Sequence, residues 1–144
     1  KEGRIGAQQA NIPASGWYCP PTIIADLPTS SSVIQEELFG PVLTLEAVPS
    51  VDHALDMVEA SRYALTGGIH TRNPRTVDAV VARSPVGNLY INRSITGAIV
   101  ARQPFGGNRR SGIGAKVGGP DYVLQFVDAQ VITQNPMRHG LVVE

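Results

Sequence analysis

Hydrophobic positions follow two different periods between residues 42 and 92. Residues 42–48 (Val-Leu-Thr-Leu-Glu-Ala-Val) form a mostly apolar run, which is typical of a strand covered on both faces. Apolar residues spaced by three and four predict amphipathic helices over 51–62 and 74–84. Residues 68–71 and 88–92 have the short apolar or alternating pattern of strands. The order strand, helix, strand, helix, strand predicts an α/β fold with a parallel sheet and covering helices.

Shorter elements are predicted on either side of this series. Aromatic and β-branched residues favour a strand over 22–27, and the two prolines before it restrict that strand to an edge. Hydroxyl side chains favour a short helix over 32–37, and a proline at the start favours another over 120–127. Residues 130–134 (Gln-Val-Ile-Thr-Gln) read as a strand, which can pair with an edge of another subunit or of this chain.

Glycines are concentrated between residues 103 and 119, beside a proline, an aromatic residue and several cations. Glycine loses more backbone entropy on folding than other residues do, so this density indicates a close approach of the backbone to another group. The glycine pair at 106–107 and the Gly-Ala pair at 97–98 can present free N–H groups to an anion. A long surface loop is the alternative. Arg109 and Arg110 are expected to be solvated loop charges.

Composition and charge narrow the class of protein. The 144 residues include 12 Lys and Arg against 12 Asp and Glu, and 42% are hydrophobic. This composition is globular, and the zero net charge disfavours binding to nucleic acid or to an anionic membrane. The chain contains no apolar run of about 18 residues and no apolar signal segment near its start, so we expect a cytoplasmic protein.

Nucleophilic and metal chemistry find little support. Cys19, the single cysteine, lies between a tyrosine and two prolines, with no nearby cation or helix start to stabilise a thiolate. We interpret it as structural, and we predict no catalytic residue in the chain. The three histidines are far apart and lack the spacing of metal ligands, so no metal site is predicted.

One carboxylate and one aromatic ring form a candidate binding pair. Glu37 and Phe39 lie two residues apart before a Gly-Pro turn, a spacing that can direct both side chains into one cleft. The carboxylate can accept hydrogen bonds from paired hydroxyls, and the ring can cover a planar heterocycle. The alternative is a solvated charge at a helix end beside an ordinary core phenylalanine.

Two of these motifs resemble the C-terminal segment of the aldehyde dehydrogenase superfamily. They are residues 37–42 (Glu-Leu-Phe-Gly-Pro-Val) and residues 104–107 (Pro-Phe-Gly-Gly), the latter followed by 111–114 (Ser-Gly-Ile-Gly). Within the superfamily, residues 96–107 and 116–126 most resemble the 1-pyrroline-5-carboxylate (L-glutamate γ-semialdehyde) dehydrogenases. The resemblance covers the chain from about residue 16 to residue 138.

The resemblance implies a role for five residues. Glu37 would bind the ribose hydroxyls next to the nicotinamide of NAD, and Phe39 would pack near that ring. The backbone of Gly97 and Ala98 would hold the α-carboxylate of the substrate, while Phe105 would pack against its aliphatic part. The position of Ala98 is serine in some members, so here only the N–H contact is expected.

The resemblance also implies the organisation of the chain. Residues 1–127 would be the C-terminal part of the catalytic domain, and residues 128–144 a tail strand that is a possible oligomerisation element. The family's NAD domain, nucleophilic cysteine and general-base glutamate lie earlier and have no counterpart here. The chain begins without methionine, and we expect it to be cut from a longer one.

These implications define the expected activity and partners. The chain would belong to an NAD-dependent enzyme of proline catabolism that forms L-glutamate, and it would be inactive alone. Its partners would be the substrate, the remainder of the dehydrogenase chain and further copies in a homo-oligomer. The alternative is a stand-alone, non-catalytic module for interaction or oligomerisation.

Overall fold

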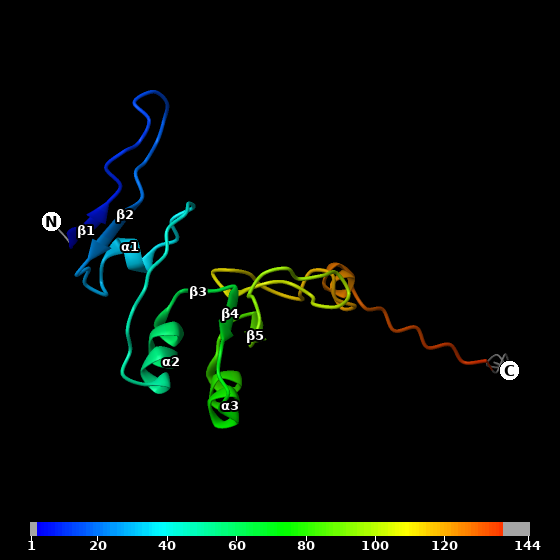
Figure 1. Cartoon of the computed structure of the whole chain (residues 1–144). Coiled ribbons are helices and arrows are strands. Elements are labelled where there is room, and N and C mark those ends of the chain that lie inside the picture. The colour runs from blue at the N-terminus through cyan, green and yellow to red at the C-terminus, as the bar shows by residue number, and fades with distance from the viewer. Residues whose placement is uncertain (1–2, 137–144) are drawn as a thin grey trace, which may run out of the picture. The chain divides into compact units, whose positions relative to one another are not determined.

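The computed structural model describes residues 3–136 and separates the chain into two compact units, Lys1–Pro49 and Ser50–Glu144 (Figure 1). The two units are taken in turn. Within the described residues, no helix is long and apolar enough to span a membrane.

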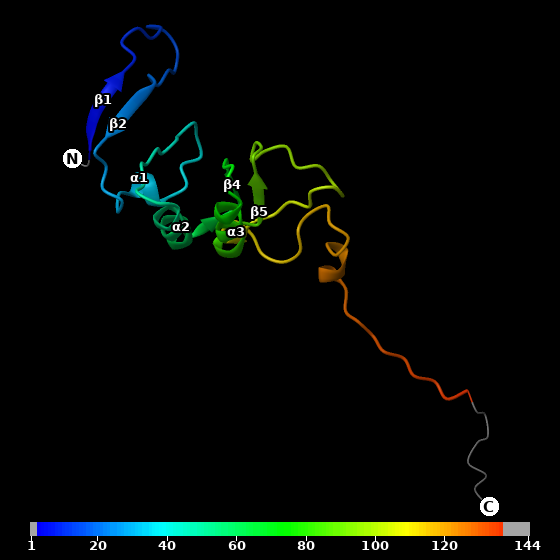
Figure 2. The ribbon, with the colours of Figure 1, turned by 60° about the horizontal axis from the view of Figure 1, so that its bottom comes forward.

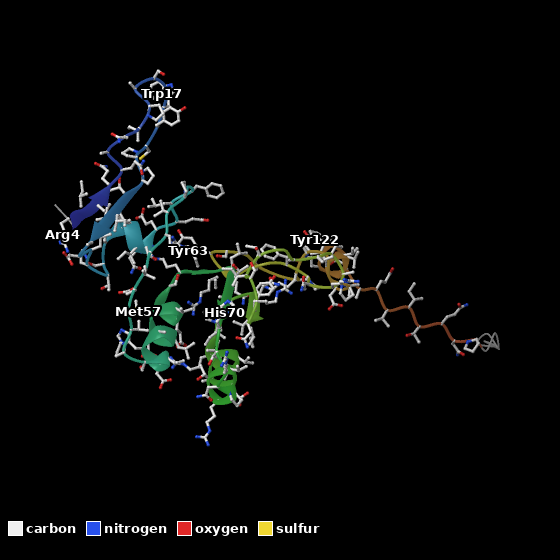
Figure 3. The ribbon with its side chains drawn as sticks, in the orientation of Figure 1. Arg4, Trp17, Met57, Tyr63, His70 and Tyr122 are labelled. Atoms are coloured by element: carbon white, nitrogen blue, oxygen red, sulfur yellow. The ribbon has the colours of Figure 1, made fainter. Side chains whose placement is uncertain are left out.

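The first unit is built on an antiparallel hairpin. Strand β1 (Arg4–Gln8) pairs with β2 (Thr22–Ala25), and the register shifts between Ile5 and Ala7. Figure 3 shows Trp17 in the loop that joins the two strands, where its side chain is fully exposed. The strand predicted over 22–27 is confirmed, and the helix predicted over 32–37 is the single turn α1 (Ser32–Gln35).

The apolar run at 42–48 does not form the predicted central strand. Its residues have no strand assignment, and Leu43 and Leu45 are 90% and 96% exposed. A strand needs a neighbour for its backbone N–H and C=O groups and a cover for its apolar faces. No strand among residues 3–136 pairs with this run, so the local pattern is present without its partner.

The second unit contains the two predicted amphipathic helices. α2 (Val51–Ala60) begins where the Ser50 hydroxyl accepts a hydrogen bond from the backbone N–H of His53. α3 (Pro74–Arg83) begins where the Asn73 side chain accepts one from Arg75. Both helices therefore start at the N-cap residues that their sequences predict.

Between and after these helices lie the two parallel strands of the unit. β4 (Thr66–Ile69) pairs in parallel with β5 (Asn88–Ile91), and Figure 2 labels the two strands next to each other. Gly68 lies opposite Tyr90. The predicted parallel sheet is thus present as one strand pair, with α3 as the crossover. A second, antiparallel pair joins β3 (Tyr63–Ala64) to β6 (Asn108–Arg109) and attaches the glycine-rich segment to this frame.

A small core and an ionic cluster hold the second unit together. Leu55 of α2, Val80 of α3 and Tyr90 of β5 are each at most 7% exposed. Across the helix pair, the Arg83 guanidinium contacts the carboxylates of Asp52, Asp56 and Glu59. The hydrogen bonds to Asp56 and then to Glu59 raise the pKa of Arg83 above its ordinary value.

The end of the chain departs from prediction. Instead of a helix over 120–127 there is the single 3₁₀ turn η1 (Val123–Phe126). Its Phe126 ring meets Tyr122, labelled in Figure 3, edge to face at 5.6 Å. Residues 130–134 form no strand, and Val131 and Ile132 are 91% and 80% exposed. Residues 137–144 of the predicted tail lie outside the described residues.

Candidate functional site

Phe105 is held through its own backbone and through both neighbouring peptide groups. Its N–H donates to the carbonyl of Val117, and its carbonyl accepts from the N–H of Val117, each at 2.9 Å. On the other side, the Asn88 carboxamide donates to the Pro104 carbonyl at 2.9 Å and accepts from the Gly106 N–H at 3.0 Å. The Phe105 side chain remains 37% exposed. The structure thus fixes the backbone at this position while leaving the ring accessible.

Gly97 is exposed and Ala98 is half-buried, in a stretch without regular secondary structure whose backbone donors are unused. Gly97 has φ +80°, and a side chain there would meet no atom within 4 Å. Among residues 3–136, no acceptor is bonded to the backbone N–H of Gly97 or Ala98. Upstream, the hydroxyls of Ser94 and Thr96 bond each other at 2.9 Å. Two adjacent free N–H groups in a glycine-permitted turn are suited to binding an anion.

The stretch that follows Gly97 and Ala98 is hydrogen-bonded to the same short segment as Phe105, residues 117–118. Val117 bonds Phe105 as described, and the next residue, Gly118, accepts a hydrogen bond from the Ala101 N–H at 3.0 Å. The Gln103 side chain closes the turn by accepting from the Ile99 N–H at 3.2 Å. One loop system, residues 97–118, therefore carries three of the five predicted binding residues, Gly97, Ala98 and Phe105, and these hydrogen bonds link its parts.

The glycines of this segment allow backbones to approach one another. A Cβ added at Gly87 would lie 1.8 Å from the carbonyl oxygen of Gly106, and one at Gly107 would lie 2.4 Å from that of Ser111. A side chain at Gly87 would force the segment away from the start of β5, and a side chain at Gly107 would force it away from Ser111. The predicted close approach is confirmed, and the approaching group is the chain's own backbone.

Cations of the segment anchor it as well. Arg109 was expected to be solvated, but its guanidinium donates to the carbonyl of Glu59, at 2.6 Å, and to that of Ser61. Arg109 and Arg110 are both exposed, as expected, but Arg109 also binds the end of α2, because the last carbonyls of a helix lack partners within it and attract a cation. The Lys116 ammonium similarly donates to the Gly107 carbonyl and to the Asn108 side chain, at 2.7 and 2.8 Å.

Glu37 and Phe39 lie in the first unit, beyond the end of α1. Both residues are exposed, and Phe39 has 101% of its reference area open. Short hydrogen-bonded turns around Gly40 shape the backbone here, from Gly40 to Leu38 at 2.7 Å and from Val42 to Gly40 at 2.8 Å. Nothing within the first unit covers Phe39.

A further feature lies at the carboxyl ends of the two parallel strands. An open hollow there is lined by His70, Thr71, Arg72 and Asn92 (Figure 3 labels His70). Asn92 closes it by donating its N–H to Ile69 and by accepting from the Thr71 N–H at 2.8 Å. None of the five predicted residues lines this hollow. Sequence reasoning did not single it out.

Sequence reasoning also missed Asn88. The available signal was an asparagine, a residue with low strand propensity, at the first position of an alternating strand directly after Pro-Val-Gly. Cys19 is exposed and has no disulfide partner. Within residues 3–136, no group of three or more His, Cys, Asp or Glu side chains is placed to hold a metal ion.

Comparison with known proteins shows the family to which the chain is similar. The model of the aldehyde dehydrogenase family matches residues 2–132. The 1-pyrroline-5-carboxylate dehydrogenase 1 of Halalkalibacterium halodurans is 41% identical over 134 residues, which are 93% of this chain and 26% of that protein. The 1-pyrroline-5-carboxylate dehydrogenase 2 of Bacillus subtilis is 40% identical over the same length. The chain thus spans about a quarter of these curated relatives.

Solved structures agree. Proline utilization A from Bdellovibrio bacteriovorus is similar with a TM-score of 0.81 and 43% identity, over 96% of this chain and 14% of that one. A 1-pyrroline-5-carboxylate dehydrogenase from Thermus with bound NAD has a TM-score of 0.76 and 38% identity, over 88% of this chain and 25% of that one.

Proposed function

Because the chain belongs to the aldehyde dehydrogenase family, we propose that it is the C-terminal portion of an NAD-dependent dehydrogenase that oxidises L-glutamate γ-semialdehyde to L-glutamate. This aldehyde is the open form of 1-pyrroline-5-carboxylate, an intermediate of proline catabolism. The proposal draws on the names of the relatives and on the binding chemistry of the described residues. The observation that carries it is the pair of unbonded N–H groups at Gly97 and Ala98, on the same loop system as Phe105.

This loop system has the chemistry that an amino-acid aldehyde requires. The free N–H groups of Gly97 and Ala98 bind the α-carboxylate of the substrate, where a carboxylate accepts strong hydrogen bonds from backbone donors. The partly exposed ring of Phe105 packs against the methylene groups between the carboxylate and the aldehyde. Holding the α-carboxylate and the methylene groups of the substrate fixes the aldehyde carbon relative to the reacting groups.

Glu37 and Phe39 suit the cofactor. The exposed Glu37 carboxylate accepts from the ribose hydroxyls of NAD, and the uncovered Phe39 ring packs near the nicotinamide. When bound, NAD accepts the hydride released by the substrate. The nucleophilic cysteine, the general base and most of the NAD site belong to the remainder of the dehydrogenase chain. This chain contributes substrate contacts and cofactor orientation, and has no turnover alone.

NADH formation tests the division of labour. The full dehydrogenase should reduce NAD with L-glutamate γ-semialdehyde, as followed by absorbance, and the 144 residues alone should not. Robust NADH production by the 144 residues would refute the proposal.

The exposed residues 128–136 favour a second role, in assembly through the predicted tail, residues 128–144, with another copy of the chain. Val131 and Ile132 offer apolar side chains that no element of the described chain covers. Light scattering should give an oligomeric mass for the full protein and a lower mass after deletion of 128–144. An unchanged mass after deletion counts against assembly through the tail, and with it against the stand-alone interaction module.

A further inference from the structure

The Asn88 side chain makes a hydrogen bond to each of the two peptide groups that flank Phe105, and we call this pair of bonds the Asn88 clamp. The amide NH₂ donates to the carbonyl before the ring, and the amide oxygen accepts from the N–H after it, at 2.9 and 3.0 Å. Both bonds are partly buried and span 16 and 18 residues of sequence. The carboxamide of Asn or Gln carries both donors and an acceptor on one planar group.

Asn88 belongs to the parallel strand pair of the second unit. The Asn88 N–H donates to the carbonyl of Leu65 at 3.1 Å, and Asn88 then begins β5, opposite Thr66 of β4. The preceding residue, Gly87, lets the loop backbone come close enough for the side chain to reach it. The position of the Phe105 backbone is therefore set from β5 on one side and from Val117 on the other.

We propose that Asn88 is a positioning residue that sets the Phe105 ring against the aliphatic part of the aldehyde substrate. This inference rests on the proposed function, which places substrate against that ring. Asn88 itself touches no substrate. Its two hydrogen bonds keep the ring in the position that binds the methylene groups, without acting on the cofactor.

Kinetics of the full dehydrogenase test this role. Asn88→Ala should raise the KM for the aldehyde about tenfold and leave kcat and the KM for NAD within about twofold, since two hydrogen bonds that hold a binding group are lost. Asn88→Asp should raise the KM as much, because a carboxylate keeps the acceptor for Gly106 but opposes the carbonyl of Pro104. A wild-type KM in Asn88→Asp would overturn the clamp.

A double-mutant cycle with Phe105→Ala separates positioning from general stability. If Asn88 acts through the ring, Asn88→Ala should change the KM less than about twofold once the ring is removed. Multiplying effects in the double variant would overturn the inference. Asn73→Ala is the matched control, since it removes an asparagine acceptor from the backbone N–H of Arg75, at the start of α3. It should leave the KM for the aldehyde unchanged.

Failure of the proposed function is read separately, in the wild-type enzyme. Absence of activity on L-glutamate γ-semialdehyde refutes that substrate, and the cycle is then run with the aldehyde that the wild type oxidises. Non-additivity of Asn88 and Phe105 with that aldehyde supports positioning of the ring. Additivity overturns it whichever aldehyde is used.

Discussion

A methyl group at Gly87 should detach the glycine-rich loop from the start of β5. The added Cβ in Gly87→Ala would lie 1.8 Å from the Gly106 carbonyl oxygen, and raising that separation to the 3.4 Å of ordinary contact takes a shift of about 1.6 Å. A loop shift of that size would lengthen the two Asn88 bonds beyond the limit of about 3.5 Å for a hydrogen bond.

The cost can be worked out from these contacts. The two hydrogen bonds contribute about 1 kcal/mol each, and a forced fit in a packed region costs about 1–3 kcal/mol. The loop should therefore be destabilised by about 3–5 kcal/mol, which corresponds to a change of about 100- to 4,000-fold in its opening equilibrium. Gly87 does not have a positive φ, so the backbone conformation itself suits alanine.

Hydrogen exchange read by mass spectrometry measures this opening in the full dehydrogenase. The reporter is a peptide covering residues 103–118, where the N–H groups of Phe105 and Val117 bond each other's residue. When closing is faster than exchange, the rate follows the opening equilibrium. Exchange within about threefold of wild type would refute the reasoning. Gly6→Ala is the control, since its nearest atom would lie at an ordinary 3.6 Å, and it should leave the reporter unchanged.

Three further substitutions test other parts of the structure. Ser50→Ala removes the N-cap acceptor of α2 and should destabilise the helix by about 1 kcal/mol, which would appear as faster amide exchange over residues 51–60. A Ser50→Asp variant, which keeps an acceptor, should exchange like wild type. Wild-type exchange rates in Ser50→Ala would contradict the cap. Arg83→Met removes the contact with three exposed carboxylates, so the unfolding midpoint in denaturant should fall and depend less on salt; equal salt dependence in both proteins would count against the cluster. Because the pKa of Arg83 is raised on folding, its contribution persists at neutral pH and is lost only as the pH rises through that raised pKa. Gly97→Ala places a side chain at φ +80°, which costs about 1–2 kcal/mol and should raise the KM for the aldehyde several-fold at an unchanged KM for NAD. Gly97→Asn should raise that KM less, because asparagine tolerates this conformation. A wild-type KM for the aldehyde in Gly97→Ala would exclude residues 97 and 98 from the substrate site.

Local features of the fold were accessible from the sequence. α2 and α3 follow from apolar residues spaced by three and four, and each begins at a side chain, Ser50 or Asn73, that caps it. Helices are predictable in this way because their hydrogen bonds join residues four apart. The motif around Phe105 likewise carried the family resemblance, which the comparison with the aldehyde dehydrogenase family confirms. The roles of Glu37, Phe39, Gly97, Ala98 and Phe105 stay predictions.

Strands and loop anchors depended on the rest of the molecule. The runs at 42–48 and 130–134 have the composition of strands, yet they pair with no strand in residues 3–136, because the partners of a strand lie outside its own segment. Of the strands predicted for the parallel sheet, only β4 and β5 pair with each other within residues 3–136.

The sequence by itself therefore determined α2 and α3, their caps and the family to which this chain belongs. Tertiary structure alone decided how the glycine-rich segment is used. The approach of Gly87 to Gly106, the Asn88 clamp on Phe105 and the Arg109 anchor at the end of α2 join residues that are 16 to 50 positions apart. No local period encodes such contacts, since they arise only when the chain has folded back on itself. The glycine-rich segment, for which a long surface loop was the alternative, is bonded to β5 through Asn88 and to α2 through Arg109. The Phe105 ring on it stays partly exposed.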